Sequence, residues 1–252
     1  MKKILFLLLF ISSLANGQSV EELFSKANTF YKQGNLEMAI ENYLEIDKQE
    51  EVSSELYYNL GNCYYKLNNV AETIYYYEKA LKLNPLNEDA RNNLVFAKRL
   101  TIDSIKELPK SILQKINKNY FQKLSYNQWA LITIVFSFLT AILFLLFYFS
   151  FRSSLKRTYF IASVFSFLFF ISALTITYNQ FIFTKNEVFA IIFSEKTEIR
   201  NEPSISSESI FTLHEGTKVR VLDAVGNWRK IKLVDGKVGW IPLKELKLLS
   251  FF

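Results

Sequence analysis

The chain has 252 residues and a formal net charge of +6; 50% of its residues are hydrophobic and 16% are aromatic. One histidine and one cysteine exclude a multi-histidine metal site and an intramolecular disulfide, and they leave no convincing nucleophile and base for catalysis. The sequence contains no phosphate-binding loop, dinucleotide fingerprint or nucleic-acid motif, so we expect no cofactor, no metal, no nucleic-acid partner and no enzymatic activity.

Residues 1–17 have the pattern of a secretory signal peptide. Lys2 and Lys3 precede the apolar stretch 4–11, and small residues follow up to Gly17. The apolar stretch is too short to span a membrane. We therefore expect cleavage near Gly17 and a mature chain that starts outside the cytoplasm; a retained amino-terminal anchor or a buried helix is the alternative.

Residues 18–105 repeat themselves with a period of 34 residues. The shift aligns residues of similar character: Ala27 with Gly61, Phe30 with Tyr64, Ala39 with Thr73, Tyr43 with Tyr77 and Ile46 with Ala80. This period, with small and aromatic residues at these places, resembles the tetratricopeptide repeat, a helix-turn-helix unit that stacks into a solenoid. The resemblance implies an all-α domain of two copies followed by a capping helix over 88–100.

The same resemblance implies a binding groove. Tetratricopeptide repeats hold a peptide or another protein on the concave face that the first helix of each copy forms. The positions that match this face are Asn28, Tyr31, Lys32, Tyr58, Asn62, Tyr65 and Lys66. Asparagine can form hydrogen bonds with a peptide backbone, tyrosine offers a flat contact surface and lysine can form an ion pair with a carboxylate. A solvated surface, with tyrosines packed between helices, is the alternative for each of them.

Residues 106–128 form a basic connector. Its apolar residues fall on one helical stripe: Ile112, Leu113, Ile116, Tyr120, Phe121 and Leu124. Lys115, Lys118 and Lys123 lie off this stripe. Such a pattern is typical of an amphipathic helix that rests on anionic lipid headgroups, and a helix packed against the repeats is the alternative.

Two charge-free apolar runs, 129–151 and 159–183, are each long enough to cross a bilayer as a helix. The segment 152–158 between them is basic, and short basic loops favour the cytoplasmic side. We therefore expect a two-helix transmembrane hairpin in a bacterial inner membrane, with a cytoplasmic loop at 152–158 and both soluble domains in the periplasm.

Residues 184–252 change to short alternating segments that are typical of strands. We expect strands over 188–193, 218–222, 228–233 and 238–241. The acidic and serine-rich stretch 195–209 reads as a solvated loop, and His214 is expected in a loop as well.

The order of these segments resembles a bacterial SH3 domain: it runs from Glu198-Ile199-Arg200 through Gly226-Asn227-Trp228 to Gly239-Trp240. The resemblance implies a small all-β barrel that binds cell-wall peptides or docks a protein. Trp228 and Trp240 are candidates for lining its groove. A small barrel also needs buried aromatics, and packing in the core is the favoured interpretation for Trp240.

The complete order of modules, with the Asn84-Pro85 turn and the Asn127-Gln128-Trp129-Ala130 approach to the first span, resembles the BatE family of bacterial aerotolerance (Bat) operons. The expected fold is a multi-domain membrane protein with a repeat solenoid, a two-helix hairpin and an SH3-like barrel. The resemblance implies a non-catalytic scaffold beside membrane-anchored proteins with von Willebrand factor A domains. The rival hypothesis is an envelope protein that binds peptidoglycan through the barrel.

Overall fold

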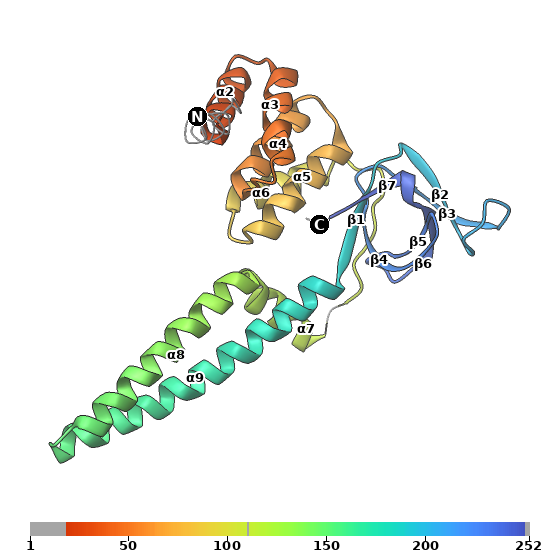
Figure 1. Ribbon diagram of the computed structural model, residues 1–252. Helices are drawn as coiled ribbons and strands as arrows, with labels where there is room; N and C mark the ends of the chain where they lie inside the picture. The colour runs from red at the N-terminus through yellow and green to blue at the C-terminus, as the bar shows by residue number, and fades with distance from the viewer. Residues whose placement is uncertain (1–18, 110, 250–252) are drawn as a thin grey trace, which may run out of the picture.

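The computed structural model describes residues 19–109 and 111–249, so the expected signal peptide lies outside the described residues. Figure 1 shows three parts: a stack of short helices, a long two-helix hairpin and a curled sheet beside the stack.

The stack consists of α2 (Val20–Lys32), α3 (Leu36–Lys48), α4 (Ser54–Lys66), α5 (Val70–Leu83) and α6 (Glu88–Ala97). The 34-residue period is visible where helices begin: Ser19, Ser53 and Asn87 each accept a hydrogen bond from the backbone N–H three residues ahead, which satisfies an otherwise unpaired donor. Gly34 and Asn68, also 34 apart, take positive φ values of 79° and 59° at the turns. The expected helical repeats are confirmed; the capping helix ends at Ala97 instead of residue 100.

Small and aromatic residues interlock in the core of the repeats. Tyr43, Tyr57 and Tyr77 are fully buried, and Gly61 lies so close to Tyr77 that a Cβ there would sit 2.5 Å from its ring. The small residue at this position of the period therefore permits α4 and α5 to approach each other.

The hairpin comprises α8 (Tyr126–Phe149) and α9 (Ser153–Asn186), preceded by α7 (Ile112–Asn119) and the 3₁₀ turn η1 (Phe121–Lys123). The first helix starts before residue 129 because Ser125 and Gln128 form a capping box. The segment 152–158 is mostly helix, not loop: α9 begins at Ser153, and its 34 residues give a length of about 51 Å.

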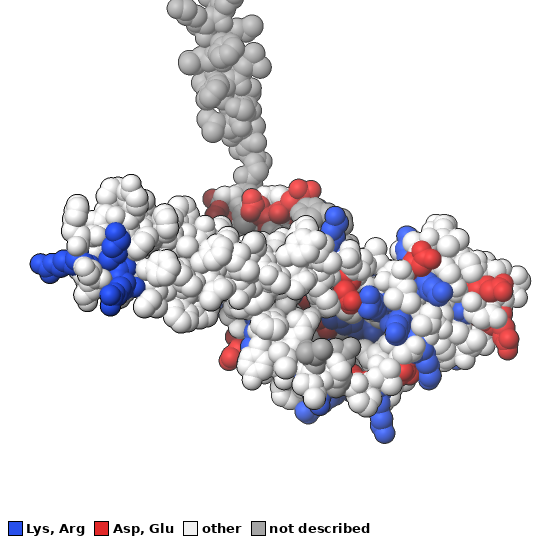
Figure 2. Space-filling view, turned by 90° about the horizontal axis from the view of Figure 1, so that it is seen from below, with Lys and Arg blue, Asp and Glu red and all other residues white. Residues whose placement is uncertain are grey.

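Among the described residues, α8 and α9 are the helices long and apolar enough to cross a membrane. Only 6% of the most apolar window of α8 and 17% of that of α9 is buried. Figure 2 shows the hairpin as a long uncharged surface with Lys and Arg at its free end. These helices are therefore unlike the core helices of a soluble protein, whose apolar faces are buried.

The sheet contains β1 (Val188–Ile192), β2 (Lys196–Arg200), β3 (Ser209–His214), β4 (Lys218–Val225), β5 (Trp228–Lys232), β6 (Val238–Pro242) and β7 (Leu246–Leu248). The spatial order is β3-β2-β6-β5-β4-β1-β7, with antiparallel pairing throughout the described registers.

Two expectations for this region are wrong. The first part of the stretch expected as a solvated loop forms β2, in which Thr197 and Ile199 point inward while Glu198 stays exposed, and only residues 201–208 form a loop before β3. His214 ends β3 and does not lie in a loop.

The sheet docks on the repeats through α5. Ile191 and Leu249 are buried in the same apolar cluster as the repeat core. Glu78 on α5 is buried and accepts hydrogen bonds from Lys98 Nζ at 2.9 Å and from Lys218 Nζ on β4 at 2.6 Å. The repeats and the barrel thus form one continuous body next to the base of the hairpin.

Candidate binding surfaces

The first helices of the repeats, α2, α4 and α6, place an asparagine network between them. Asn28 Oδ1 accepts hydrogen bonds from the Tyr43 hydroxyl and, at 3.3 Å, from Asn59 Nδ2. The period reproduces this arrangement 34 residues later, where Tyr77 and Asn93 donate to Asn62 Oδ1 at 2.7 and 3.0 Å. The capping helix α6 therefore continues the groove as a further first helix would.

The hydrogen-bond network decides which side-chain atoms of Asn28 and Asn62 remain available to a ligand. The side-chain oxygens of Asn28 and Asn62 are engaged, whereas their amide nitrogens donate to none of the described residues. Burial raises the pKa values of Tyr43 and Tyr77, so both phenols stay protonated and keep donating to these oxygens. Each asparagine is thus held in place with its amide donors free for the carbonyl of an extended peptide.

The remaining predicted groove residues supply aromatic and basic contacts. Lys66 Nζ lies 4.0 Å from the centre of the Tyr31 ring, and Tyr65 is 39% exposed. Tyr58 is half-buried and packs at 6.1 Å from Tyr77, so it contributes to helix packing as well as to the face. Lys32 is exposed at the end of α2, and among the described residues no contact joins it to the others.

Asn59 belongs to the groove network but was missed by the sequence prediction, and Asn93 on the capping helix belongs to the network as well. They are 34 residues apart, as are Asn28 and Asn62, which they contact. The 34-residue period of the sequence could therefore have identified both. What the period alone does not show is which side of each helix faces its neighbour.

A second surface lies on the outward face of the barrel. Across β2, β6 and β5, Arg200 pairs in register with Trp240, which pairs with Lys230. Lys230 Nζ lies 5.8 Å from the centre of the Trp240 ring, a cation–π contact. Trp228 stands in the adjacent row, opposite Pro242.

Both tryptophans are half-buried and lie outside the barrel's apolar core, so packing of Trp240 in the core is wrong. The physical reason is the alternation of β6: Gly239 and Ile241 are buried, which turns Trp240 outward. Lys230 and Arg200, which the sequence prediction missed, lie beside the tryptophans; the Arg200 guanidinium also pairs with Glu198 at 2.8 Å and donates to the Ser207 carbonyl. We call Trp228, Trp240, Arg200 and Lys230 the tryptophan patch.

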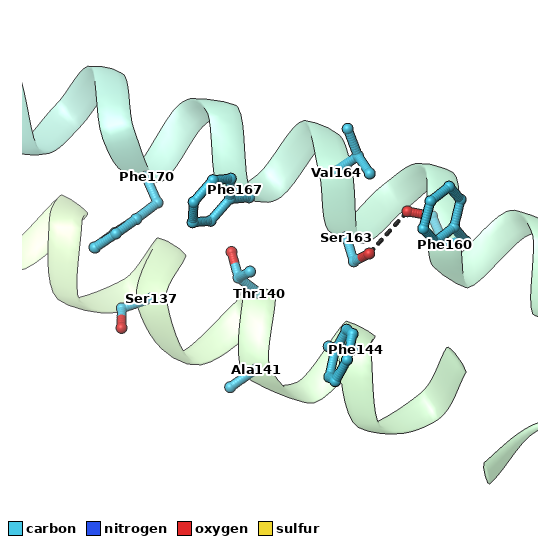
Figure 3. Close-up of a pocket in the computed structure, with 9 residues that line it drawn as sticks. All are labelled: Ser137, Thr140, Ala141, Phe144, Phe160, Ser163, Val164, Phe167 and Phe170. Carbon is cyan, nitrogen blue, oxygen red and sulfur yellow. Dashed lines mark hydrogen bonds between the residues drawn. The ribbon is translucent and has the colours of Figure 1, made fainter. Parts of the chain in front are cut away.

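A third feature is a cleft of about 480 Å³ between α8 and α9 (Figure 3). Its lining comprises Ser137, Thr140, Ala141, Phe144, Phe160, Ser163, Val164, Phe167 and Phe170. Hydroxyl pairs tie the helices together beside it, Thr140 with Ser166 at 2.8 Å and Thr133 with Thr177 at 3.0 Å. Small and hydroxyl side chains at a helix–helix contact are typical of membrane hairpins.

The environments of Cys63, Asp103 and His214 are those of structural groups. No three His, Cys, Asp or Glu side chains in this part of the chain are placed to hold a metal ion. Burial raises the pKa of the Cys63 thiol to about 12, so it stays protonated. Asp103 accepts from the ring and backbone of His214 and from Thr217, which fastens the segment after α6 to the barrel.

Two known families match parts of the chain. The tetratricopeptide repeat matches residues 54–87, which correspond to α4 and α5, and the bacterial SH3 domain matches residues 195–247. The chain contains a tetratricopeptide repeat and a bacterial SH3 domain. Both are typically binding modules without catalytic activity. No curated protein matches the chain.

Proposed function

We propose that this protein is a non-catalytic membrane scaffold whose repeats bind a partner protein in the concave groove. The observation that carries the proposal is the repeated asparagine network of α2, α4 and α6. It positions amide donors, exposed Tyr65 and exposed Lys66 on one face of a domain that is docked on the barrel. Three first helices give an extended peptide a row of equivalent contacts.

Membrane anchoring is supported by the exposed apolar surface of the hairpin. Phe138 of α8 and Phe165 of α9 are 67% and 59% exposed, and many other apolar side chains along both helices are exposed as well. Apolar surface of this extent is unfavourable in water and favourable in lipid. We therefore propose that α8 and α9 span a bacterial inner membrane.

The orientation in the membrane is part of the proposal and rests on the signal-like amino terminus. The basic loop with Arg152, Lys156 and Arg157 favours the cytoplasmic side for the free end of the hairpin, but Lys115, Lys123 and Lys185 at its base weaken that charge difference. A membrane-impermeant maleimide tests the periplasmic placement. It should label Ser206→Cys, on an exposed barrel loop, in intact cells; labelling only after lysis would refute it.

The order of modules supports a finer assignment. A tetratricopeptide repeat, a membrane hairpin and a bacterial SH3 domain in this order resemble the BatE family, so we propose a place in a Bat-type complex linked to aerotolerance or envelope stress. The expected partners are membrane-anchored proteins with von Willebrand factor A domains.

Crosslinking in intact cells followed by purification of the full chain tests the groove. Tyr65→Ala with Lys66→Ala should abolish capture of a discrete membrane-protein partner, because both side chains are exposed on the groove. Glu41→Ala with Lys48→Ala, exposed on the second helix α3, is the matched control and should leave capture intact. Equal capture by both variants, with unchanged circular dichroism, would refute the groove.

Peptidoglycan binding is a second candidate, which the tryptophan patch favours. Tryptophan rings stack on sugars, and Lys230, which forms no ion pair with a described residue, can pair with a carboxylate of a cell-wall peptide. Cosedimentation of the full chain with sacculi tests it. Trp240→Ala should lower the bound fraction, whereas Ile205→Ala, 81% exposed on a barrel loop, should not. Unchanged cosedimentation of Trp240→Ala excludes this role for the patch.

A further inference from the structure

The short helix α7 presents an apolar stripe that the described residues leave uncovered. Ile112, Ile116 and Tyr120 follow one another at intervals of four residues, so they lie along one side of the helix and its end. They are 77%, 41% and 67% exposed. Such a stripe on a helix of eight residues is unfavourable in water.

The stripe lies at the end of the hairpin where the bilayer surface would be. The chain runs from α7 through η1 directly into α8, and Trp129 Nε1 donates to the Phe121 carbonyl at 2.9 Å. Tyr126, at the start of α8, packs edge-to-face on Phe181 near the end of α9 at 6.0 Å. Tryptophan and tyrosine favour the boundary between lipid and water. Figure 1 draws α7 at this same end of the hairpin.

The charge around α7 has one sign. Between Glu107 and Glu187 the sequence has no acidic residue. Lys115 on α7, Lys123 on η1 and Lys185 on α9 are exposed. Because no acidic side chain of this stretch neutralises these lysines, the base of the hairpin suits negatively charged headgroups.

From these observations we infer that α7 lies in the plane of the bilayer surface. Ile112, Ile116 and Tyr120 insert at the boundary of headgroups and acyl chains, and Lys115 and Lys123 bind the phosphates of anionic lipids. The inference rests on the membrane placement proposed above, but it holds for either orientation of the hairpin.

The contact would also fix the height of the soluble body above the membrane. Ile105 packs against the barrel core, and the Leu108 backbone N–H donates to the Val234 carbonyl at 3.2 Å. The segment before α7 is therefore attached to the barrel, so that an interfacial α7 holds the barrel close to the lipid.

Spin labels on the full chain in lipid nanodiscs test the inference through their accessibility to oxygen and to a polar nickel reagent. Labels are placed at Ile116→Cys, at Phe165→Cys as a mid-membrane reference and at Ser206→Cys as an aqueous reference. Cys63 is fully buried, and the unmodified chain checks that it stays unlabelled. The label at position 116 should report a depth just below the phosphates when phosphatidylglycerol is present.

Neutralising Lys115→Gln and Lys123→Gln should make that label shallower, since each lysine contributes about fivefold to partition onto an anionic surface. The same shift is expected when phosphatidylcholine replaces phosphatidylglycerol. A label at position 116 as water-accessible as the one at 206 would overturn the inference, as would a depth independent of both lysines and lipid charge. If the label at 165 is also in water, the membrane placement itself has failed.

Discussion

Replacing Glu78 by Gln tests whether a buried charge holds the barrel on the repeats. The carboxylate lies between Lys98 on one side and Lys218 of the barrel on the other, with N–O distances of 2.9 and 2.6 Å. Burial alone would raise the pKa of Glu78, but the two ammonium groups outweigh burial and lower it to about 2.

The free energy by which the two lysines stabilise the charged form of Glu78 follows from this pKa. A fall from the ordinary value of 4.5 to about 2 corresponds to about 3 kcal/mol, at 1.36 kcal/mol per pH unit. Only the pair with Lys218 crosses to the barrel, and both lysines are partly exposed and regain water when the carboxylate is lost, so we expect Glu78→Gln to weaken docking by about 1–2 kcal/mol. Because the folded pKa is lowered, the stabilisation is complete above pH 4.5 and is lost as the pH falls towards 2.

Hydrogen exchange of the full chain in detergent measures the effect. Glu78→Gln should speed exchange in peptides from α5 and β4, which meet at the interface. Glu72→Gln is the matched control, because Glu72 lies on the same helix and forms no ion pair with a described residue. A double-mutant cycle with Lys218→Met should give a non-additive effect. Equal exchange in the two Gln variants, or full additivity, would refute the argument.

Three further outcomes are expected. Gly61→Ala should lower repeat stability by about 1–3 kcal/mol in thermal unfolding, because its Cβ would meet the Tyr77 ring; an unchanged melting temperature contradicts the packing. Cys63 should resist maleimide until the chain is unfolded, since burial raises its pKa to about 12; rapid native labelling would show that the helix opens. Asp103→Asn should destabilise the barrel at neutral pH and less in acid, because hydrogen bonds from His214 and Thr217 outweigh burial and lower the pKa of Asp103; pH-independent destabilisation contradicts this.

Local and periodic features were predictable from the sequence. The 34-residue period predicted the helices of the repeats. A capping residue begins the first helix of each repeat at the same position of the period, as Ser19, Ser53 and Asn87 show. The two long apolar helices followed from length and hydropathy alone, although the capping box of Ser125 and Gln128 starts α8 earlier and α9 already begins at Ser153.

Features that depend on which way a side chain points were less predictable. The strand β2 was not predicted because charged Lys196, Glu198 and Arg200 share its outward face. Only Thr197 and Ile199 show the alternation of inward and outward side chains that is typical of a strand. The docking of the barrel on α5 depends on contacts between residues more than a hundred positions apart, for which a single sequence carries no local pattern.

The docking of the barrel on α5 keeps the proposed groove and the tryptophan patch apart. The barrel contacts α5, a second helix, and so leaves the face formed by the first helices α2, α4 and α6 uncovered, as the exposure of Tyr65 and Lys66 shows. The tryptophan patch lies on β2, β6 and β5, whereas β1, β4 and β7 are the strands nearest to the repeats. A ligand on the patch therefore does not displace a partner in the groove. If the proposed partner and the cell wall are held in the same assembly, binding at one surface raises the effective concentration at the other, and two modest affinities then suffice for stable attachment.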